Sequence, residues 1–217
     1  MNQEQLQAIN QEIIIHGIEG TAFQEYGHEI VLEGTKEFVV YAEQEISFPI
    51  EGSAYQTSEE VFLQHPLIAQ IRDLVYGGMP VQAGRCVGHN QVLNGVEYHQ
   101  GSETIVAVTD TVLILGKLRD MQDYHYDLGK AEFFYVERGR CVELYGTTLH
   151  YTPCQVEASG FATICILPEG TNTPIEHTNH PILTKKNKFF ITHPTMTAKI
   201  AQGAKPYLIG DIVGIRI

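Results

Sequence analysis

Short apolar runs that alternate with turns make up most of this 217-residue chain. The runs are rich in β-branched and aromatic residues, recur at intervals of about a dozen residues and have glycine in many joints. This spacing is typical of an all-β sandwich or barrel, whereas βαβ units need helices between their strands. We expect strands over residues 13–15, 38–41, 80–88, 95–99, 104–108, 112–118, 131–136, 141–145, 149–153, 162–167, 189–192 and 209–217.

Only two segments have the pattern of a helix. Residues 2–10 predict a short polar helix. In residues 57–76, Ser58 is a candidate N-cap, an apolar stripe follows at helical spacing, and a pair of glycines ends the pattern. Pro66 interrupts this segment, so we expect a short turn up to His65 and a longer helix from Pro66, because proline is favoured as the first helical residue.

The length fits one domain with a substantial core. Most expected strands lie from residue 78 onward, so we predict a β-barrel over residues 78–217. Residues 1–77 are then an N-terminal α/β extension that packs on the barrel and supplies helices and edge strands.

The charge balance argues against two classes of partner. Fourteen Lys and Arg against 26 Asp and Glu give a net charge of -12, which repels nucleic acid and anionic membranes. The one basic cluster, residues 185–188, is short. Because no apolar run approaches the roughly 20 residues of a membrane span and no signal peptide begins the chain, we expect a cytoplasmic protein without nucleic-acid or membrane partners.

The cysteines show no metal-binding spacing. Cys86, Cys141, Cys154 and Cys165 include no Cys-x-x-Cys pair, and three of them lie within apolar runs. In the expected compartment we interpret them as buried structural thiols rather than a disulfide pair or a metal set.

Four metal-capable side chains stand out from the strand pattern. Glu97-x-His99-x-x-x-Glu103 lies on an expected strand and the turn at Gly101, and His150 follows about fifty residues later. Alternation in a strand places Glu97 and His99 on one face, and the turn brings Glu103 to the same side. We therefore predict that Glu97, His99, Glu103 and His150 form a site for a divalent metal ion.

The spacing resembles the two motifs of the cupin superfamily, G-x5-H-x-H-x3-E-x6-G and G-x5-P-x-G-x2-H-x3-N. His99 and Glu103 match the second histidine and the glutamate, and Gly139 stands eleven residues before His150, the full spacing of the second motif. The resemblance implies a double-stranded β-helix (jelly-roll) barrel that holds a metal ion. Glu97 replaces the first histidine, and Gln91, Asp110, Tyr145, Thr147 and Cys154 replace other motif positions.

A two-histidine, two-carboxylate set favours Mn, Fe or Zn over copper. Residues 78–82, 88–90, 93–94, 97–103, 142–150 and 167–174 are also similar to an uncharacterised bacterial cupin-like family associated with sugar utilisation. The closest understood chemistry is that of cupin sugar isomerases, such as lyxose isomerase and the cupin type of phosphoglucose isomerase.

Three residues are candidates for proton transfer. Glu143 is the first choice, because alternation places it opposite Val142 and Leu144 and so toward a cavity or solvent. Lys117 ends an apolar run, where it is either a buried functional charge or simply a strand end in water. His89 precedes the first motif and is either at the barrel mouth or a turn residue.

Other polar residues are interpreted as structural. Asp110 lies between two strand runs and is expected in a turn. His177 and His180 lie between Pro174 and Pro181, which indicates a surface loop rather than a metal-binding pair.

The resemblance implies a metal-dependent enzyme that isomerises or epimerises a small carbohydrate through an enediol. Few positive residues lie near the motifs, so a neutral sugar or sugar acid fits better than a phosphorylated sugar, which Arg85, Lys117 and Arg119 keep open. A lyase or oxygenase acting on a small polar acid is the alternative, and a non-catalytic, metal-containing sugar-binding protein is a third hypothesis. Because cupin barrels have edge strands that pair readily, we also expect a homodimer.

Overall fold

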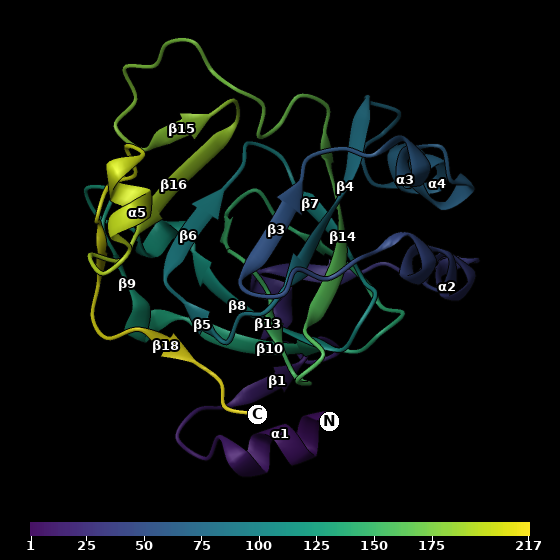
Figure 1. The fold of residues 1–217 in the computed structure, drawn as a ribbon, viewed down its shortest axis with the longest axis horizontal. Helices are drawn as coiled ribbons and strands as arrows, with labels where there is room; N and C mark the ends of the chain where they lie inside the picture. Colours follow the sequence, from purple (N-terminus) through teal and green to yellow (C-terminus); the bar gives the residue numbers. More distant parts are fainter.

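Two sheets face each other across the interior of the computed structural model, which describes residues 1–217 (Figure 1). The first contains, in spatial order, β1 (Ile15–Gly17), β10 (Glu132–Val136), β8 (Thr111–Lys117) and β12 (Thr148–Leu149), with β13 (Cys154–Gln155) also paired to β8. The second contains β2 (Gly27–Glu29), β11 (Cys141–Leu144), β7 (Glu103–Ala107), β14 (Phe161–Pro168), β4 (Val81–Gly88) and β3 (Ser53–Gln56).

The interior between these sheets is apolar at one end. Ile105 and Leu144 of the second sheet pack with Leu113 and Phe134 of the first, and all four are buried. The strands that supply them are antiparallel within each sheet, with Leu113 opposite Phe134 and Glu103 opposite Leu144. The mainly β barrel predicted from the sequence is confirmed.

Three small sheets complete the barrel. β6 (Gly95–Tyr98) pairs with β16 (Lys188–Thr192), which forms a hairpin with β15 (Leu183–Lys185). β5 (Val92–Leu93) pairs with β18 (Val213–Gly214), and β9 (Tyr126–Asp127) pairs with β17 (Leu208–Ile209). Single turns of 3-10 helix lie at Phe23–Glu25, Leu118–Asp120 and Leu128–Lys130.

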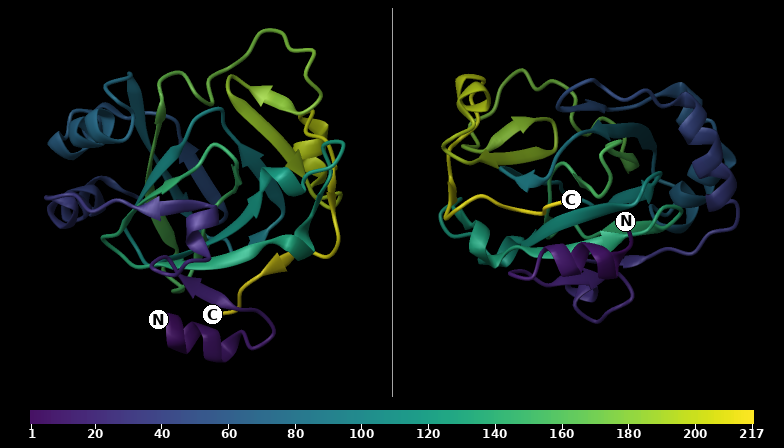
Figure 2. Two further views of the ribbon diagram at one scale, coloured as in Figure 1. Left: turned by 180° about the vertical axis from the view of Figure 1, so that it is seen from behind. Right: turned by 60° about the horizontal axis from the view of Figure 1, so that its bottom comes forward.

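The first 77 residues extend both sheets. β1 pairs in parallel with β10, β2 pairs with β11, and β3 pairs with β4. The helix α1 (Gln3–Ile9) lies beside β1 and next to the C-terminus, where Asn10 Oδ1 accepts a hydrogen bond of 2.8 Å from the Arg216 N–H (Figure 2). A domain boundary at residue 77 stays a prediction.

Three helices cover the outer face of the second sheet: α2 (Thr35–Glu45), α3 (Glu60–Leu63) and α4 (Pro66–Leu74) (Figure 1). The predicted break at Pro66 is confirmed, with Pro66 as the first residue of α4. The predicted cap at Ser58 is wrong, because Glu59 holds the N-cap position. A short helix, α5 (Thr197–Ala201), also lies outside the two predicted segments.

The strand predicted at residues 38–41 is wrong, since these residues belong to α2. Phe38, Val39 and Ala42 are buried against the sheet, while Val40 is half exposed. A run of four apolar residues fits either structure, and the burial pattern is helical. The strand predicted over residues 209–217 is interrupted at Gly210, which has a positive φ of 86°.

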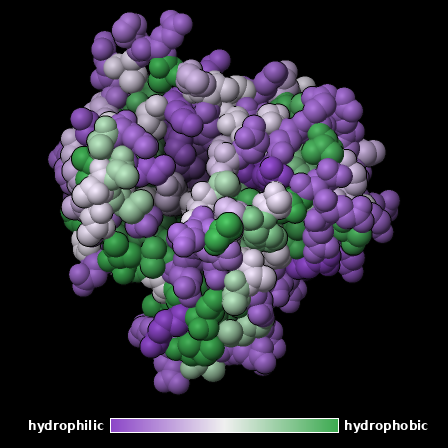
Figure 3. Space-filling model, viewed as in Figure 1, coloured by the Kyte–Doolittle hydropathy of each residue, from purple (hydrophilic) through white to green (hydrophobic).

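Hydrophilic residues cover most of the face shown in Figure 3. Exposed apolar side chains near the two termini include Ile9, Ile14 and Ile217. No helix combines the length and the apolar character that crossing a bilayer requires.

Candidate metal centre

The four predicted ligands converge inside the barrel. Glu97 lies on β6, His99 directly follows it, Glu103 begins β7 and His150 follows β12. Glu97 and His150 are paired across two chain segments, because each main-chain N–H donates to the other residue's carbonyl, at 2.7 and 3.0 Å. One ligand atom each of Glu97, His99 and His150 lies within 4.8 Å of the other two.

Glu103 joins the two histidines. Its Oε2 lies 2.9 Å from His150 Nε2 and 3.6 Å from His99 Nε2. Glu97 Oε1 lies 3.8 Å from His99 Nε2. The fold therefore brings two imidazoles and two carboxylates together in a buried position, and this donor set can coordinate a metal ion.

The other ring nitrogens determine how the histidines can act. His99 Nδ1 lies 2.7 Å from the Asn187 carbonyl, and His150 Nδ1 lies 3.0 Å from the Thr148 carbonyl. Because a carbonyl only accepts, each Nδ1 carries the proton and each neutral ring presents a lone pair at Nε2.

These Nε2 atoms are the strongest sign of a cation. Both are buried, and as the lone pairs of neutral rings they accept no hydrogen bond from any neighbouring donor. A carboxylate oxygen and an imidazole lone pair at 2.9 Å repel each other unless a proton or a metal ion lies between them. The residues present therefore fit a divalent metal ion.

The electrostatics favour the ligating state of Glu103 and His99. Burial raises the pKa of Glu103, but the neighbouring His150 and His99 outweigh it and lower the pKa to about 2. Burial lowers the pKa of His99, which keeps its ring neutral. At His150 burial also lowers the pKa, but the charge and hydrogen bond of Glu103 reverse the shift and raise it. A metal ion would replace the proton that Glu103 attracts to His150.

Two residues of the hairpin between β15 and β16 belong to the site and were missed by the sequence analysis. The Lys188 ammonium forms an ion pair with Glu97 Oε2, and its side chain lies 5.4 Å from the Phe190 ring centroid. Asn187, with a positive φ of 58°, accepts the His99 hydrogen bond. The signal was the basic cluster 185–188, which sequence reasoning weighed only as a nucleic-acid patch.

Tyr55 and Asn172 form another part of the site that sequence reasoning missed. Tyr55 on β3 is opposite Cys86 on β4, and Asn172 Nδ2 donates to Tyr55 Oη at 3.2 Å. β3 approaches closely because Gly84 has no side chain, and a Cβ there would clash with the Gln56 carbonyl. Burial raises the pKa of Tyr55, and the charges of Glu103 and Glu97 raise it further.

The three predicted proton-transfer residues are not joined to the cluster by any hydrogen bond or ion pair. Glu143 lies on the outer face of β11, with Oε2 3.6 Å from His28 Nε2. The barrel interior is itself the packed side that Val142 and Leu144 face, so alternation directs Glu143 outward rather than toward the cluster.

Lys117 and His89 lie elsewhere on the barrel. Lys117 Nζ is 3.4 Å from Glu25 and 3.7 Å from Glu132, and it lines a cavity of about 440 Å³ with Glu25 and Arg119. The His89 N–H donates to the Gly52 carbonyl at 2.7 Å, beyond the end of β4. The catalytic roles of these residues stay predictions.

Three residues interpreted as structural have ordinary surroundings. Asp110 Oδ1 accepts a hydrogen bond of 2.7 Å from the Arg138 N–H. His177 is exposed, and His180 is half-buried with its ring 5.0 Å from that of Phe189. None of them contacts the metal-capable cluster.

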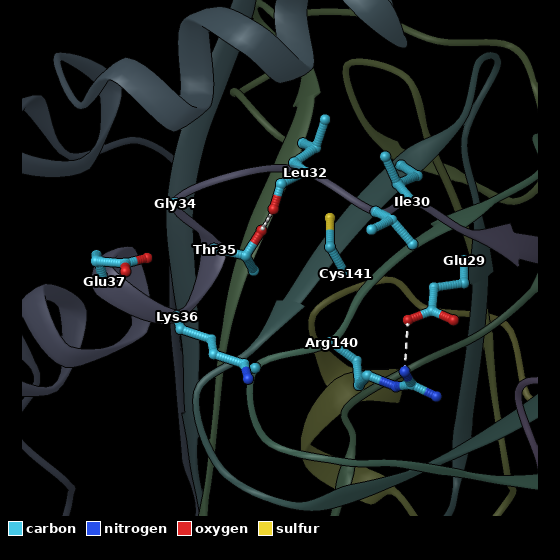
Figure 4. Close-up of a pocket in the computed structure, with 11 residues that line it drawn as sticks. Glu29, Ile30, Leu32, Gly34, Thr35, Lys36, Glu37, Arg140 and Cys141 are labelled. Atoms are coloured by element: carbon cyan, nitrogen blue, oxygen red, sulfur yellow. Dashed lines mark hydrogen bonds and ion pairs between the residues drawn. The ribbon is translucent and has the colours of Figure 1, made fainter.

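A separate pocket of about 290 Å³ lies between α2 and the edge of the second sheet (Figure 4). Arg140 and Glu29 point toward one another there, 3.0 Å apart, and Thr35 Oγ1 donates to the Leu32 carbonyl at 2.9 Å. None of the predicted site residues lines the pocket.

The model of one protein family matches residues 15–213, and its description is "Domain of unknown function (DUF4867)". The chain belongs to the DUF4867 family. The match extends over the extension and the barrel together. No curated protein matches the sequence of this DUF4867 chain significantly.

Solved structures of cupin-fold proteins resemble this DUF4867 chain at low identity. A variant of Bacillus subtilis oxalate decarboxylase is 9% identical, with a TM-score of 0.36 over 80% of this chain and 40% of that one. A structure from work on the Mn(II) centres of the same enzyme is 8% identical, with a TM-score of 0.35 over 78% and 40%.

Salicylate 1,2-dioxygenase from Pseudoaminobacter salicylatoxidans, in complex with gentisate, is 9% identical, with a TM-score of 0.32 over 62% of this chain and 30% of that one. The DUF4867 chain thus spans 40% or less of the length of these three structures.

Proposed function

We propose that this protein is a metal-dependent enzyme that isomerises or epimerises a small carbohydrate through an enediol. One observation carries the proposal: the buried, unpartnered Nε2 atoms of His99 and His150 lie beside the Glu103 carboxylate. Such a donor set holds a divalent ion, and Mn, Fe or Zn suits its nitrogen and oxygen atoms.

In this proposal His99, Glu103 and His150 hold the metal ion. When bound, the ion polarises the substrate carbonyl and stabilises the neighbouring oxygen, which acidifies the intervening C–H bond. Glu97 is then either the fourth ligand or the carboxylate that moves the proton between adjacent carbons. Burial raises the pKa of Glu97, but Lys188 and the two neighbouring histidines together outweigh it and lower the pKa, which keeps the Glu97 carboxylate ionised.

The test combines metal analysis with turnover. Purified protein is analysed for bound metal and then incubated with pentoses, hexoses, the corresponding sugar acids and their 2-keto forms in turn, with Mn, Fe or Zn. We expect interconversion of at least one aldose and ketose, or of one epimer pair, which is lost in His99→Ala and His150→Ala but kept in His177→Gln. Inertness toward every sugar, with metal bound, would refute the proposal.

The second candidate function is a lyase or oxygenase acting on a small polar acid. The observation that favours it is Lys188, a cation at the metal-capable cluster that can attract a carboxylate. Loss of CO₂ or water from hydroxy and keto acids, or O₂ consumption with them, distinguishes this function from isomerisation.

The third candidate is a non-catalytic, metal-containing sugar-binding protein. Saturable sugar binding without turnover in either assay would support it. The association with sugar utilisation, the cytoplasmic location and the homodimer also stay proposals. Light scattering coupled to size-exclusion chromatography tests the dimer.

A further inference from the structure

Of three polar side chains outside the predicted ligand set, one contacts the metal-capable cluster and the other two lie on segments that are joined to its hairpin or to the adjoining sheet. The three are Tyr55 from β3, Asn172 from the loop after β14, and Lys188 at the start of β16, and together we call them the polar wall. Lys188 contacts Glu97 directly. Tyr55 is close enough for the charges of Glu97 and Glu103 to raise the pKa of its hydroxyl.

Hydrogen bonds hold the polar wall together. Asn172 Nδ2 donates to Tyr55 Oη at 3.2 Å, which connects the loop to β3. The Asn172 N–H donates to the Lys186 carbonyl at 2.9 Å, and the Lys186 N–H donates to the Thr173 carbonyl at 2.9 Å. The loop and the hairpin that carries Lys188 are therefore one connected structure, built from three distant segments.

The polar wall contains a buried acceptor without a donor. Asn172 is only 4% exposed, and its Oδ1 has no hydrogen-bond partner. Because an unsatisfied buried oxygen is costly, this atom suits a hydroxyl or other donor of a ligand. Tyr55 Oη already accepts from Asn172, so its own proton is free to be donated.

The charge of the site indicates what else the ligand carries. Glu97 and Glu103 contribute two negative charges, a divalent ion cancels both, and Lys188 leaves one positive charge in excess. An uncompensated charge is unfavourable in a buried site, so a ligand with a single negative charge is preferred over a neutral one. Lys188 has three N–H donors and can bind a ligand carboxylate while still contacting Glu97.

We propose that the substrate is a sugar acid, whose carboxylate is bound by Lys188 and Tyr55 and whose hydroxyl donates to Asn172 Oδ1. The carbohydrate part of this assignment rests on the proposed function, whereas the carboxylate part rests on the polar wall alone. The polar wall thereby selects charged over neutral carbohydrates.

The test uses two probes that differ in one group. D-Glucuronate carries a carboxylate where D-glucuronamide carries a neutral amide of nearly the same size. Binding of each to the full-length, metal-loaded protein is measured by isothermal titration calorimetry. We expect glucuronate to bind about tenfold more tightly, the effect of one hydrogen bond to a charged group. Lys188→Met removes this preference, while the matched exposed variant Lys185→Met keeps it.

Tyr55→Phe examines the hydroxyl separately and is expected to weaken glucuronate binding severalfold with little effect on the amide. Equal affinity for the two probes, or no saturable binding of either, overturns the proposal. A preference for glucuronate that persists in Lys188→Met overturns the role of Lys188. Metal content and circular dichroism of each variant identify misfolding. Selective glucuronate binding without turnover of any sugar would refute the isomerase but leave the carboxylate-binding role of the polar wall standing.

Discussion

Glu97 and His150 exchange two main-chain hydrogen bonds, of 2.7 and 3.0 Å, across an isolated antiparallel bridge. Opposite residues in such a pair project their side chains to the same face. The bridge therefore joins the segment that carries His99 and Glu103 to the segment that carries His150. Two sequence motifs become one site because of this backbone contact.

Removal of a histidine ligand should abolish tight metal binding. We expect His99→Ala and His150→Ala each to lower the affinity for Mn or Zn by at least about 100-fold, the upper range for losing an outer partner of a ligand. Equilibrium dialysis with elemental analysis measures this. His177→Gln, at an exposed histidine, serves as control and should bind as the wild type does.

Metal removal should lower stability. A ligand that binds only the folded state, at about 100 times its Kd, adds about 2.7 kcal/mol to the free energy of unfolding. We expect that increment in urea unfolding of the Mn-loaded protein relative to protein treated with EDTA. His150→Ala should show no increment, and an increment of unchanged size in that variant would place the ion elsewhere.

Asn187 should influence the metal although its side chain does not face it. The side chain accepts from the Gln100 N–H at 2.7 Å and donates to Thr171 Oγ1 at 3.0 Å, which holds the carbonyl that orients His99. Asn187→Gly tolerates the positive φ but loses both bonds, so we expect metal affinity to fall about tenfold. Asn187→Asp keeps the oxygen that accepts from the Gln100 N–H, so its metal affinity should fall less than that of Asn187→Gly. Unchanged affinity in Asn187→Gly would show that the hairpin does not position His99.

His65 should make stability depend on pH far from the metal centre. Its Nδ1 accepts from the Leu67 N–H at 3.2 Å and caps α4. Burial lowers the pKa of His65 below its ordinary value of 6.5, so the folded state favours the neutral ring. Stability from this group is present above pH 6.5 and is lost as the pH falls through that value toward the lowered pKa.

The measurement is urea unfolding at pH 8 and pH 5 for wild type, His65→Ala and His65→Asn. At pH 8 the alanine variant should lose about 1 kcal/mol, the usual loss on removing an N-cap. Asparagine can also serve as the N-cap of α4, but its side chain does not titrate. On going from pH 8 to pH 5, the free energy of unfolding should therefore fall more in wild type than in His65→Asn. A constant difference between these two proteins would contradict the prediction.

The four cysteines should be inert in the native protein. All four are free and buried, and burial raises the pKa of each thiol. The thiolate is the reactive form, so dithionitrobenzoate should label none of them within minutes, and all four in guanidinium. Rapid labelling of any native thiol would show that its segment opens readily.

Local patterns were sufficient for the strands and the ligand cluster. Alternation along β6 put Glu97 and His99 on one face, and proline chemistry located the start of α4. Both predictions depend only on residues that are close together in the sequence. Alternation correctly separated Glu143 from Val142 and Leu144, but period alone does not say which face of β11 is the barrel interior.

The polar wall and the Asn187 carbonyl were beyond sequence reasoning for a different reason. Tyr55, Asn172 and Lys188 come from three segments that only tertiary pairing brings together, and none has a distinctive local spacing. The same reason explains the wrong prediction for residues 38–41. These residues are helical because α2 packs on the second sheet, and that is a tertiary contact.

The carbonyl that orients His99 belongs to Asn187, far along the chain from all four ligands. Ribosomal synthesis proceeds from the N-terminus, so a nascent chain already contains every ligand before this carbonyl is made. Such a chain has its donors but nothing to fix the tautomer of His99. We therefore expect the His99 ring to adopt its ligating orientation only after the hairpin of β15 and β16 has been synthesised and has folded.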